Sequence, residues 1–213
     1  MIALTNFSNN QDIIFVLITI SFFLIALLRA SYWKHASLLF MAVFAQRYAN
    51  QYLREENAFT ERVSFITFLL LSINFSLIIL KFINFKSILE VTLLILSVML
   101  FFLLKISVIY LIGKVFIVED VAKLCIFFSL LFDRALAFFL FPFIVILYFF
   151  VFDIIIMILI FIAILCLLLL ILKISWMFKI GTNSFGISRF YIFLYLCVLE
   201  ISPILLLGKV VFY

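Results

Sequence analysis

The sequence predicts an all-α protein: a polytopic transmembrane bundle of about six spans, with one or two amphipathic helices at the membrane surface. The chain is 70% apolar and 12% charged, and its mean hydropathy is +1.49. A soluble domain is about 45 to 50% apolar and about 25% charged. The apolar residues form runs that can cross a bilayer core of roughly 30 Å at about 1.5 Å per residue. We therefore expect residues 1–213 to form a single transmembrane domain.

Six apolar runs define the predicted spans, which are residues 13–28, 63–80, 88–112, 135–152, 154–172 and 188–212. No basic residue precedes the first run and no small-residue cleavage site follows it, so we interpret it as a membrane helix and not as a signal peptide. The fourth and fifth spans are separated by Asp153. A tight hairpin is favoured there, because one helix over residues 135–172 would be nearly twice the thickness of the bilayer core.

Residues 37–54 are predicted to form an interfacial amphipathic helix. Apolar side chains recur at helical spacing along it; they are Met41, Phe44, Ala45, Tyr48 and Tyr52. Polar side chains fall on the opposite face; they are Arg47, Asn50, Gln51 and Arg54. Two interpretations stay open. The helix lies on anionic headgroups, or it is a docking surface for a partner, since Asn and Gln contribute little to lipid binding.

Two further polar segments follow. Residues 113–134 mix charged and apolar positions, and we expect a second interfacial or partly re-entrant helix there. Residues 173–189 contain the turn-forming stretch Gly181-Thr-Asn-Ser-Phe-Gly186. This stretch is not a phosphate loop, because Ile187 and Ser188 stand where Lys and Ser or Thr would be required.

The basic residues indicate how the chain crosses the membrane. Residues 29–62, 113–134 and 173–189 carry five, three and three of them, which is 11 of the 15 in the chain. With six spans these segments share one face, and the positive-inside rule makes that face cytoplasmic. Both termini are then expected in the periplasm. A cytoplasmic C-terminus would instead indicate five spans.

The composition argues against several classes of function. The net charge of +5 is spread over the ends of apolar runs and forms no nucleic-acid patch. His35 is the one histidine of the sequence, and each cysteine lies alone in an apolar run, so we expect no metal site, cofactor or disulfide. Enzyme chemistry in a membrane needs a nucleophile with a base, a metal cluster or paired carboxylates. The sequence therefore predicts no catalytic residues.

The most informative residue is Glu200, which falls near the middle of the last predicted span. Pro203 follows it, and because proline cannot donate to the carbonyl of Leu199, we expect a helix kink beside the acid. A charge at mid-bilayer costs roughly 2.5 to 3.5 kcal/mol on insertion scales. Glu200 is therefore expected to be neutral or paired with a cation, and Lys105 in the third span is the candidate partner. Alternatively, the Lys105 stem carries its ammonium to the membrane surface.

Three roles for Glu200 stay open at this stage. The acid fixes helix packing, carries protons or ions, or, least favoured by these residues, takes part in catalysis. We expect a non-enzymatic subunit of a larger membrane assembly in envelope biogenesis or protein secretion, with membrane-protein partners. The alternative is a small proton-coupled carrier or channel component. A carrier is expected to show broken helices in matching positions, and the last span alone shows a break beside an ionisable residue.

Two stretches carry a family resemblance. They are Phe44-Ala-Gln-Arg-Tyr-Ala-Asn-Gln-Tyr-Leu-Arg-Glu55 and Phe190-Tyr-Ile-Phe-Leu-Tyr-Leu-Cys-Val-Leu-Glu-Ile-Ser-Pro203. Together they resemble a family of integral inner-membrane proteins of the Bacteroidota, a domain of unknown function with a C-terminal box Leu-Tyr-Leu-Cys-Thr-Leu-Glu-Ile-Leu-Pro. Val198 and Ser202 depart from the Thr and Leu of that box. The resemblance implies an inner-membrane location in a Gram-negative cell and leaves the activity open.

Overall fold

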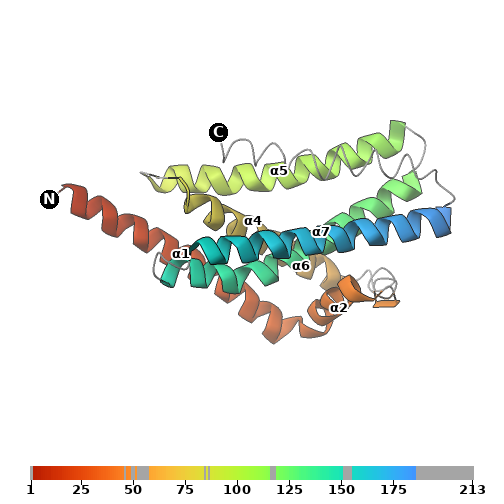
Figure 1. Ribbon diagram of the computed structural model, residues 1–213, viewed down its shortest axis with the longest axis horizontal. Helices are drawn as coiled ribbons and strands as arrows, with labels where there is room; N and C mark the ends of the chain where they lie inside the picture. Colours follow the sequence, from red (N-terminus) through yellow and green to blue (C-terminus); the bar gives the residue numbers. More distant parts are fainter. Residues whose placement is uncertain are drawn as a thin grey trace. The chain divides into compact units, whose positions relative to one another are not determined.

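The computed structural model describes residues 2–45, 47–48, 51, 58–83, 85, 87–115, 119–150 and 155–185. Over these residues every regular element is an α-helix (Figure 1). In chain order the helices are α1 (Ile2–Ser31), α2 (Trp33–Phe44), α4 (Ala58–Leu80), α5 (Ile88–Val115), α6 (Glu119–Phe149) and α7 (Ile155–Phe185). The predicted all-α class is confirmed.

Five of these helices contain a segment long and apolar enough to cross a membrane. The segments are Gln11–Ser31, Glu61–Leu80, Ile88–Val115, Cys125–Phe149 and Met157–Trp176. The sixth predicted span, residues 188–212, lies outside the described residues. Five candidate spans are thus present in the part of the chain that the structure describes, and the sixth stays a prediction.

The chain divides into two compact units, one formed by Met1–Phe101 with Leu131–Cys166 and the other by Phe102–Leu130 with Leu167–Tyr213. The first unit has a continuous apolar core to which α1, α4, α5, α6 and α7 all contribute. Its buried members are Leu17, Ile18, Ile73, Leu77, Leu80, Phe85, Val91, Leu140, Ile144, Leu147, Ile158 and Ile162. This core positions the polar side chains described below.

Within the first unit α4 is the most enclosed helix. From Leu70 to Leu77 every side chain is buried except that of Phe75, which is half-buried. Because 3.6 residues make one turn, a run of buried positions this long is covered on all sides. Ser72, Asn74 and Ser76 belong to this run, so polar groups lie where no water or headgroup reaches them. Such groups need partners within the protein.

The predicted amphipathic helix over residues 37–54 is interrupted at Ala45. α1 ends at Ser31, the chain turns at Tyr32, and α2 ends at Phe44 because Ala45 takes an extended conformation with φ −138° and ψ 125°. The buried residues of α2 are Ala36, Leu38, Leu39, Ala42 and Val43. Met41 and Phe44, which the sequence places on the apolar face, are exposed, as the lipid-facing side chains of an interfacial helix would be. A different face of α2, also apolar, packs against the bundle.

The predicted separate helix within residues 113–134 is also wrong. α6 begins at Glu119 and continues through Asp133 and Arg134 to Phe149, so residues 119–134 and most of the fourth predicted span form one helix. Asp133 and Arg134 are half-buried. Charged side chains do not end a helix when no glycine or proline accompanies them, because their backbone groups bond as usual. The charged residues Asp133 and Arg134 therefore indicate a change of environment along α6 and not the end of a helix.

The start of α7 agrees with the sequence analysis, whereas its end does not. α6 ends at Phe149 and α7 begins at Ile155, so two helices occupy the region in which one long helix was the alternative. At its other end α7 continues to Phe185, so residues 181–185 are helical and not a turn. A glycine within a helix costs about 1 kcal/mol relative to alanine, which the surrounding helix formers can offset.

Candidate functional site

The structure places four of the predicted site residues outside the described part of the chain: Glu200, Pro203, Asn50 and Arg54. Arg47 and Gln51 are described, and both are exposed. Lys105 lies in α5, is half-buried, and takes part in an interaction with its surroundings. The predicted pairing of Glu200 with Lys105 therefore stays a prediction.

Asn74 of α4 is a fully enclosed polar side chain of the first unit. Its Nδ2 donates a hydrogen bond of 2.7 Å to the backbone carbonyl of Ala137 in α6, and the side chain is fully buried. Its Oδ1 is buried without a hydrogen-bond partner. A buried amide oxygen left unpaired costs about 1 to 3 kcal/mol. Asn74 thus joins two membrane helices while keeping one unused acceptor at membrane depth.

The buried hydroxyl groups of α4 bond to their own helix. Thr67 donates to the carbonyl of Val63 at 2.7 Å, Ser72 to that of Phe68 at 3.0 Å, and Ser76 to that of Ser72 at 2.7 Å. Such bonds satisfy a hydroxyl without linking helices. Ser21 of α1 differs, because its Oγ is buried without a hydrogen-bond partner. Ser21 and Asn74 therefore provide two unused oxygen acceptors in the buried part of this unit.

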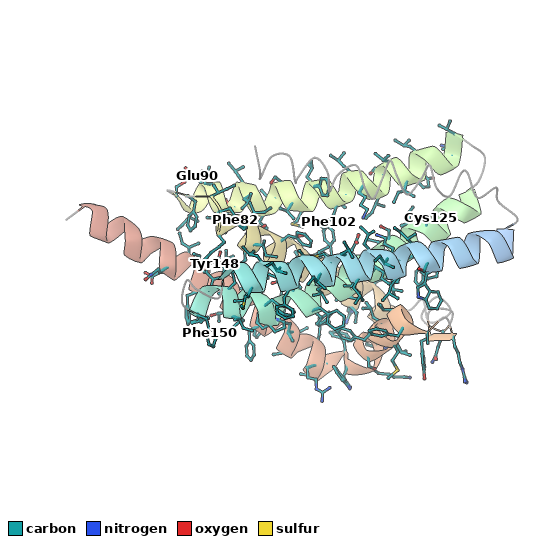
Figure 2. All side chains as sticks on the ribbon, in the orientation of Figure 1. Phe82, Glu90, Phe102, Cys125, Tyr148 and Phe150 are labelled. Carbon is teal, nitrogen blue, oxygen red and sulfur yellow. The ribbon has the colours of Figure 1, made fainter. Side chains whose placement is uncertain are left out.

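A second bond between α4 and α6 involves Tyr148, which is labelled in Figure 2 near the end of α6. Its hydroxyl donates to the carbonyl of Leu77 at 2.7 Å. The N–H of Lys81, four residues on, donates to Ile78 instead, at 3.2 Å. The carbonyls in the last turn of a helix lack intrahelical donors, so Tyr148 caps the C-terminal turn of α4. The Lys81 Nζ lies 5.1 Å from the centre of the Tyr148 ring, within cation–π distance.

In the second unit the sequence analysis missed a buried lysine. Lys173 of α7 is 3% exposed, and its Nζ donates to the hydroxyl of Ser129 in α6 at 3.1 Å. The rings of Phe128 and Trp176 stack with their centres 6.3 Å apart. Lys173 had been assigned to the polar flank of the fifth span, whereas the candidate span runs to Trp176. Apolar residues follow Lys173 in the sequence, and they indicate that the fifth span continues beyond it. The residues that flank the end of a membrane span are polar instead.

Exposed apolar side chains gather on α2 and basic side chains lie beside them. Trp33, Met41 and Phe44 are 48%, 47% and 65% exposed. The Arg29 guanidinium carbon lies 3.6 Å from the centre of the Trp33 ring. Large exposed apolar groups on one face of a helix indicate contact with lipid or with another protein. This surface is distinct from the buried polar contacts described above.

The structure gives His35 an aromatic neighbour. Its ring stacks on that of Phe59 in α4, with ring centres 5.8 Å apart and an interplanar angle of 3°. Among the described residues no three His, Cys, Asp or Glu side chains lie close enough to hold a metal ion. Cys125 and Cys166 are both half-buried. The described part of the chain thus presents a set of helix-to-helix polar contacts and one exposed apolar surface.

Apolar helices of membrane-spanning length, joined at depth by single polar contacts, define a multi-pass α-helical membrane protein. Over residues 14–211 the sequence matches the family described as Domain of unknown function (DUF4271), and the chain belongs to this family. No curated protein and no solved structure matches the chain.

Proposed function

We propose that the chain is a non-enzymatic integral subunit of a larger assembly in the inner membrane of a Gram-negative bacterium of the Bacteroidota. The assembly would serve envelope biogenesis or protein secretion, and both termini of the chain would lie in the periplasm. One observation carries the proposal. In the described residues, three polar side chains within candidate membrane spans join helices of the chain to one another; they are Asn74, Tyr148 and Lys173.

This use of polar groups favours a scaffold over a carrier. A carrier presents its polar side chains and unwound backbone to a path for the substrate. Here the Asn74 amide and the Tyr148 hydroxyl each bond a backbone carbonyl of the neighbouring helix. Such bonds stabilise one arrangement of helices, which suits a subunit that presents a fixed surface to partners. The proposed partner surface contains the exposed Arg47 and Gln51, with Asn50 and Arg54 added from the sequence pattern.

The proposal is tested by recovering the full chain from native membranes in mild detergent. The double variant Asn50→Ala with Gln51→Ala removes two amides without changing the charge. It is expected to lose a stoichiometric protein partner that the wild type retains, while its abundance in the membrane is unchanged. Gln11→Ala, at another exposed amide, is the matched control. If only Arg47→Ala and Arg54→Ala have an effect, and the loss follows the lipid charge in vesicle-binding assays, headgroup binding is the better account of these residues. A wild-type chain recovered alone would contradict the subunit proposal.

A second candidate function is a small proton-coupled carrier or channel component. The burial of Lys173 inside a candidate span favours it, because ionisable residues inside membrane helices are characteristic of ion and proton pathways. Vesicles containing the purified chain would then show a proton flux that Lys173→Met or Glu200→Gln abolishes. A chain that gives no flux yet retains its stoichiometric partner would favour the subunit.

A further inference from the structure

The exposed face of α2 forms one continuous stripe. At about 100° per residue, the side chains on this side of the helix are those of Trp33, Lys34, Ser37, Met41 and Phe44. The opposite side carries the buried Ala36, Leu39 and Val43, so α2 is fixed to the bundle by one face. At the edge of the stripe, one helical turn before Phe44, the ring of the half-buried Phe40 meets that of Phe138 in α6 with 4.6 Å between ring centres. The stripe therefore has a defined outward direction.

Arg29 extends this stripe with a cation. It lies in the last turn of α1, one helical turn before Trp33, and its guanidinium covers the Trp33 ring at 3.6 Å. Stacking occupies the face of the guanidinium group, whereas its N–H donors point outward in the plane of the group. A phosphate oxygen can bind those donors without displacing the ring. Lys34 is exposed on the same side of α2 and adds a second cation.

All the charged residues in the sequence around the stripe are basic. Between residues 13 and 54 there is no Asp or Glu, and the charged residues are Arg29, Lys34, Arg47 and Arg54. The first candidate span ends at Ser31, and the stripe begins two residues later, at the position expected for the membrane surface. Tryptophan rings concentrate at this depth, and anionic headgroups attract basic residues there. Depth, charge and amphipathic shape all fit a lipid surface.

We propose that the α2 stripe binds anionic phospholipids of the adjoining leaflet. Trp33, Met41 and Phe44 enter the boundary between headgroups and acyl chains, and Arg29 and Lys34 bind the phosphates. α2 then lies in the plane of the membrane as an anchor fixed to the bundle, which sets the depth of the exposed Arg47 and Gln51 that follow it. The residues of the α2 stripe are not part of the proposed partner surface. The lipid-binding proposal and the partner proposal can therefore be disproved independently.

The full chain allows a direct test because it contains two tryptophans, Trp33 and Trp176. The variant Trp176→Phe keeps a ring beside Phe128 and leaves Trp33 as the one tryptophan, which is excited selectively at the red edge of the absorption band. The purified protein is reconstituted in bilayers of phosphatidylcholine and phosphatidylglycerol, in which either one lipid or the other carries bromine near the headgroup end of its chains. We expect brominated phosphatidylglycerol to quench Trp33 more strongly than brominated phosphatidylcholine at equal mole fraction. The reverse variant, Trp33→Phe, gives the background from Trp176.

Removing the cation should remove the lipid preference. In the Trp176→Phe background, Arg29→Gln is expected to lower the preference for phosphatidylglycerol about five-fold, which is the effect of one basic residue at an anionic surface. Lys114→Gln is the matched control, because it changes the net charge equally at an exposed lysine in the last turn of α5. It should leave the quenching of Trp33 unchanged.

Three outcomes would overturn the inference. Equal quenching by both brominated lipids would remove the headgroup specificity. Quenching by iodide in the buffer but by neither lipid would place Trp33 in water. Protection from both kinds of quencher would mean that a second copy of the chain covers the stripe. Circular dichroism of each variant confirms that the helices remain folded.

Discussion

The amide of Asn74 in α4 donates to the carbonyl of Ala137 in α6 at 2.7 Å. Ala137 precedes Phe138, whose carbonyl loses its helical donor because Pro142 lies within α6. Asn74 therefore holds α6 beside its weakest turn. Because α4 is enclosed on all sides from Leu70 to Leu77, this bond forms inside the bundle, where water cannot replace it.

The first prediction concerns this bond. Asn74→Ala should lower the free energy of unfolding in detergent by about 1 kcal/mol, the size of an interhelical hydrogen bond between membrane helices. Ser76→Ala is the matched control, because Ser76 is equally buried and its hydroxyl bonds within α4. It should have a smaller effect, measured by denaturant titration of both variants. If Asn74→Leu is more stable than the wild type, the unpaired Oδ1 outweighs the bond.

The second prediction concerns the cap on α4. Tyr148→Phe removes the hydroxyl that bonds the carbonyl of Leu77, and the nearby Lys81 N–H is already directed to Ile78. We expect a loss of about 1 to 3 kcal/mol in stability, because a carbonyl is left without a donor. Hydrogen exchange should accelerate in the last turn of α4. Tyr110→Phe, at an exposed tyrosine of α5, should leave both quantities unchanged.

The third prediction concerns the buried lysine of the second unit. Ser129→Ala leaves the Lys173 ammonium buried without its hydroxyl acceptor, whereas Lys173→Met removes the charge and keeps a long apolar side chain. Breaking a buried polar pair costs more than replacing its charged member by an apolar residue of similar length. Ser129→Ala should therefore lower the yield of folded protein more than Lys173→Met, measured by size-exclusion chromatography in detergent. The reverse order would show that the charge itself stabilises the unit.

Much of the fold could be predicted from the sequence because the bilayer imposes a simple length rule. Apolar runs between basic residues located the helices, and α5 begins at Ile88, where the third run begins. The errors arose where the same pattern permits two environments. α2 is apolar on both faces, so periodicity could not decide which face meets the bundle. Asp133 and Arg134 looked like the end of a surface helix, although α6 continues through them.

The site residues were harder to predict because their roles depend on contacts far apart in the sequence. Asn74 and Ala137 are 63 residues apart, and Ser129 and Lys173 are 44 residues apart. In the sequence Asn74 is one polar residue in an apolar run, and Lys173 looks like a flanking charge. The sequence analysis used intramembrane polarity to single out Lys105 and Glu200, whose roles stay predictions, and the same signal applied to Asn74 and Lys173 would have found them.

The fourth prediction concerns topology and follows from the distribution of basic residues. Reporter fusions after residue 153 and at Tyr213 should both report a location outside the cytoplasm. A fusion after Lys114 should report the cytoplasm and serves as the internal control. A cytoplasmic C-terminus would contradict the six-span arrangement, since five candidate spans would then account for the chain.

The last prediction concerns Glu200, whose carboxyl group falls within the sixth predicted span beside Pro203. Glu200→Gln keeps size and hydrogen bonding but removes ionisation, whereas Glu200→Ala removes both. If the acid is neutral and serves packing, Gln should be tolerated and Ala should lower the yield of folded protein. If it is charged and paired with Lys105, Gln should lower the yield, and adding Lys105→Met should restore much of the loss, because replacing both members costs less than breaking the pair.

A proton-carrying Glu200 gives a third pattern. Glu200→Gln would then show normal abundance and normal partner recovery but no function, because the carboxamide cannot release a proton. Lys173→Met separates this role from a general effect of intramembrane charge, since it removes an ionisable group at a different buried position. Abundance, partner recovery and growth are measured for all variants together. If Gln and Ala at position 200 both match the wild type in all three, the carboxylate has no central role, and Asn74 and Lys173 become the first residues to test.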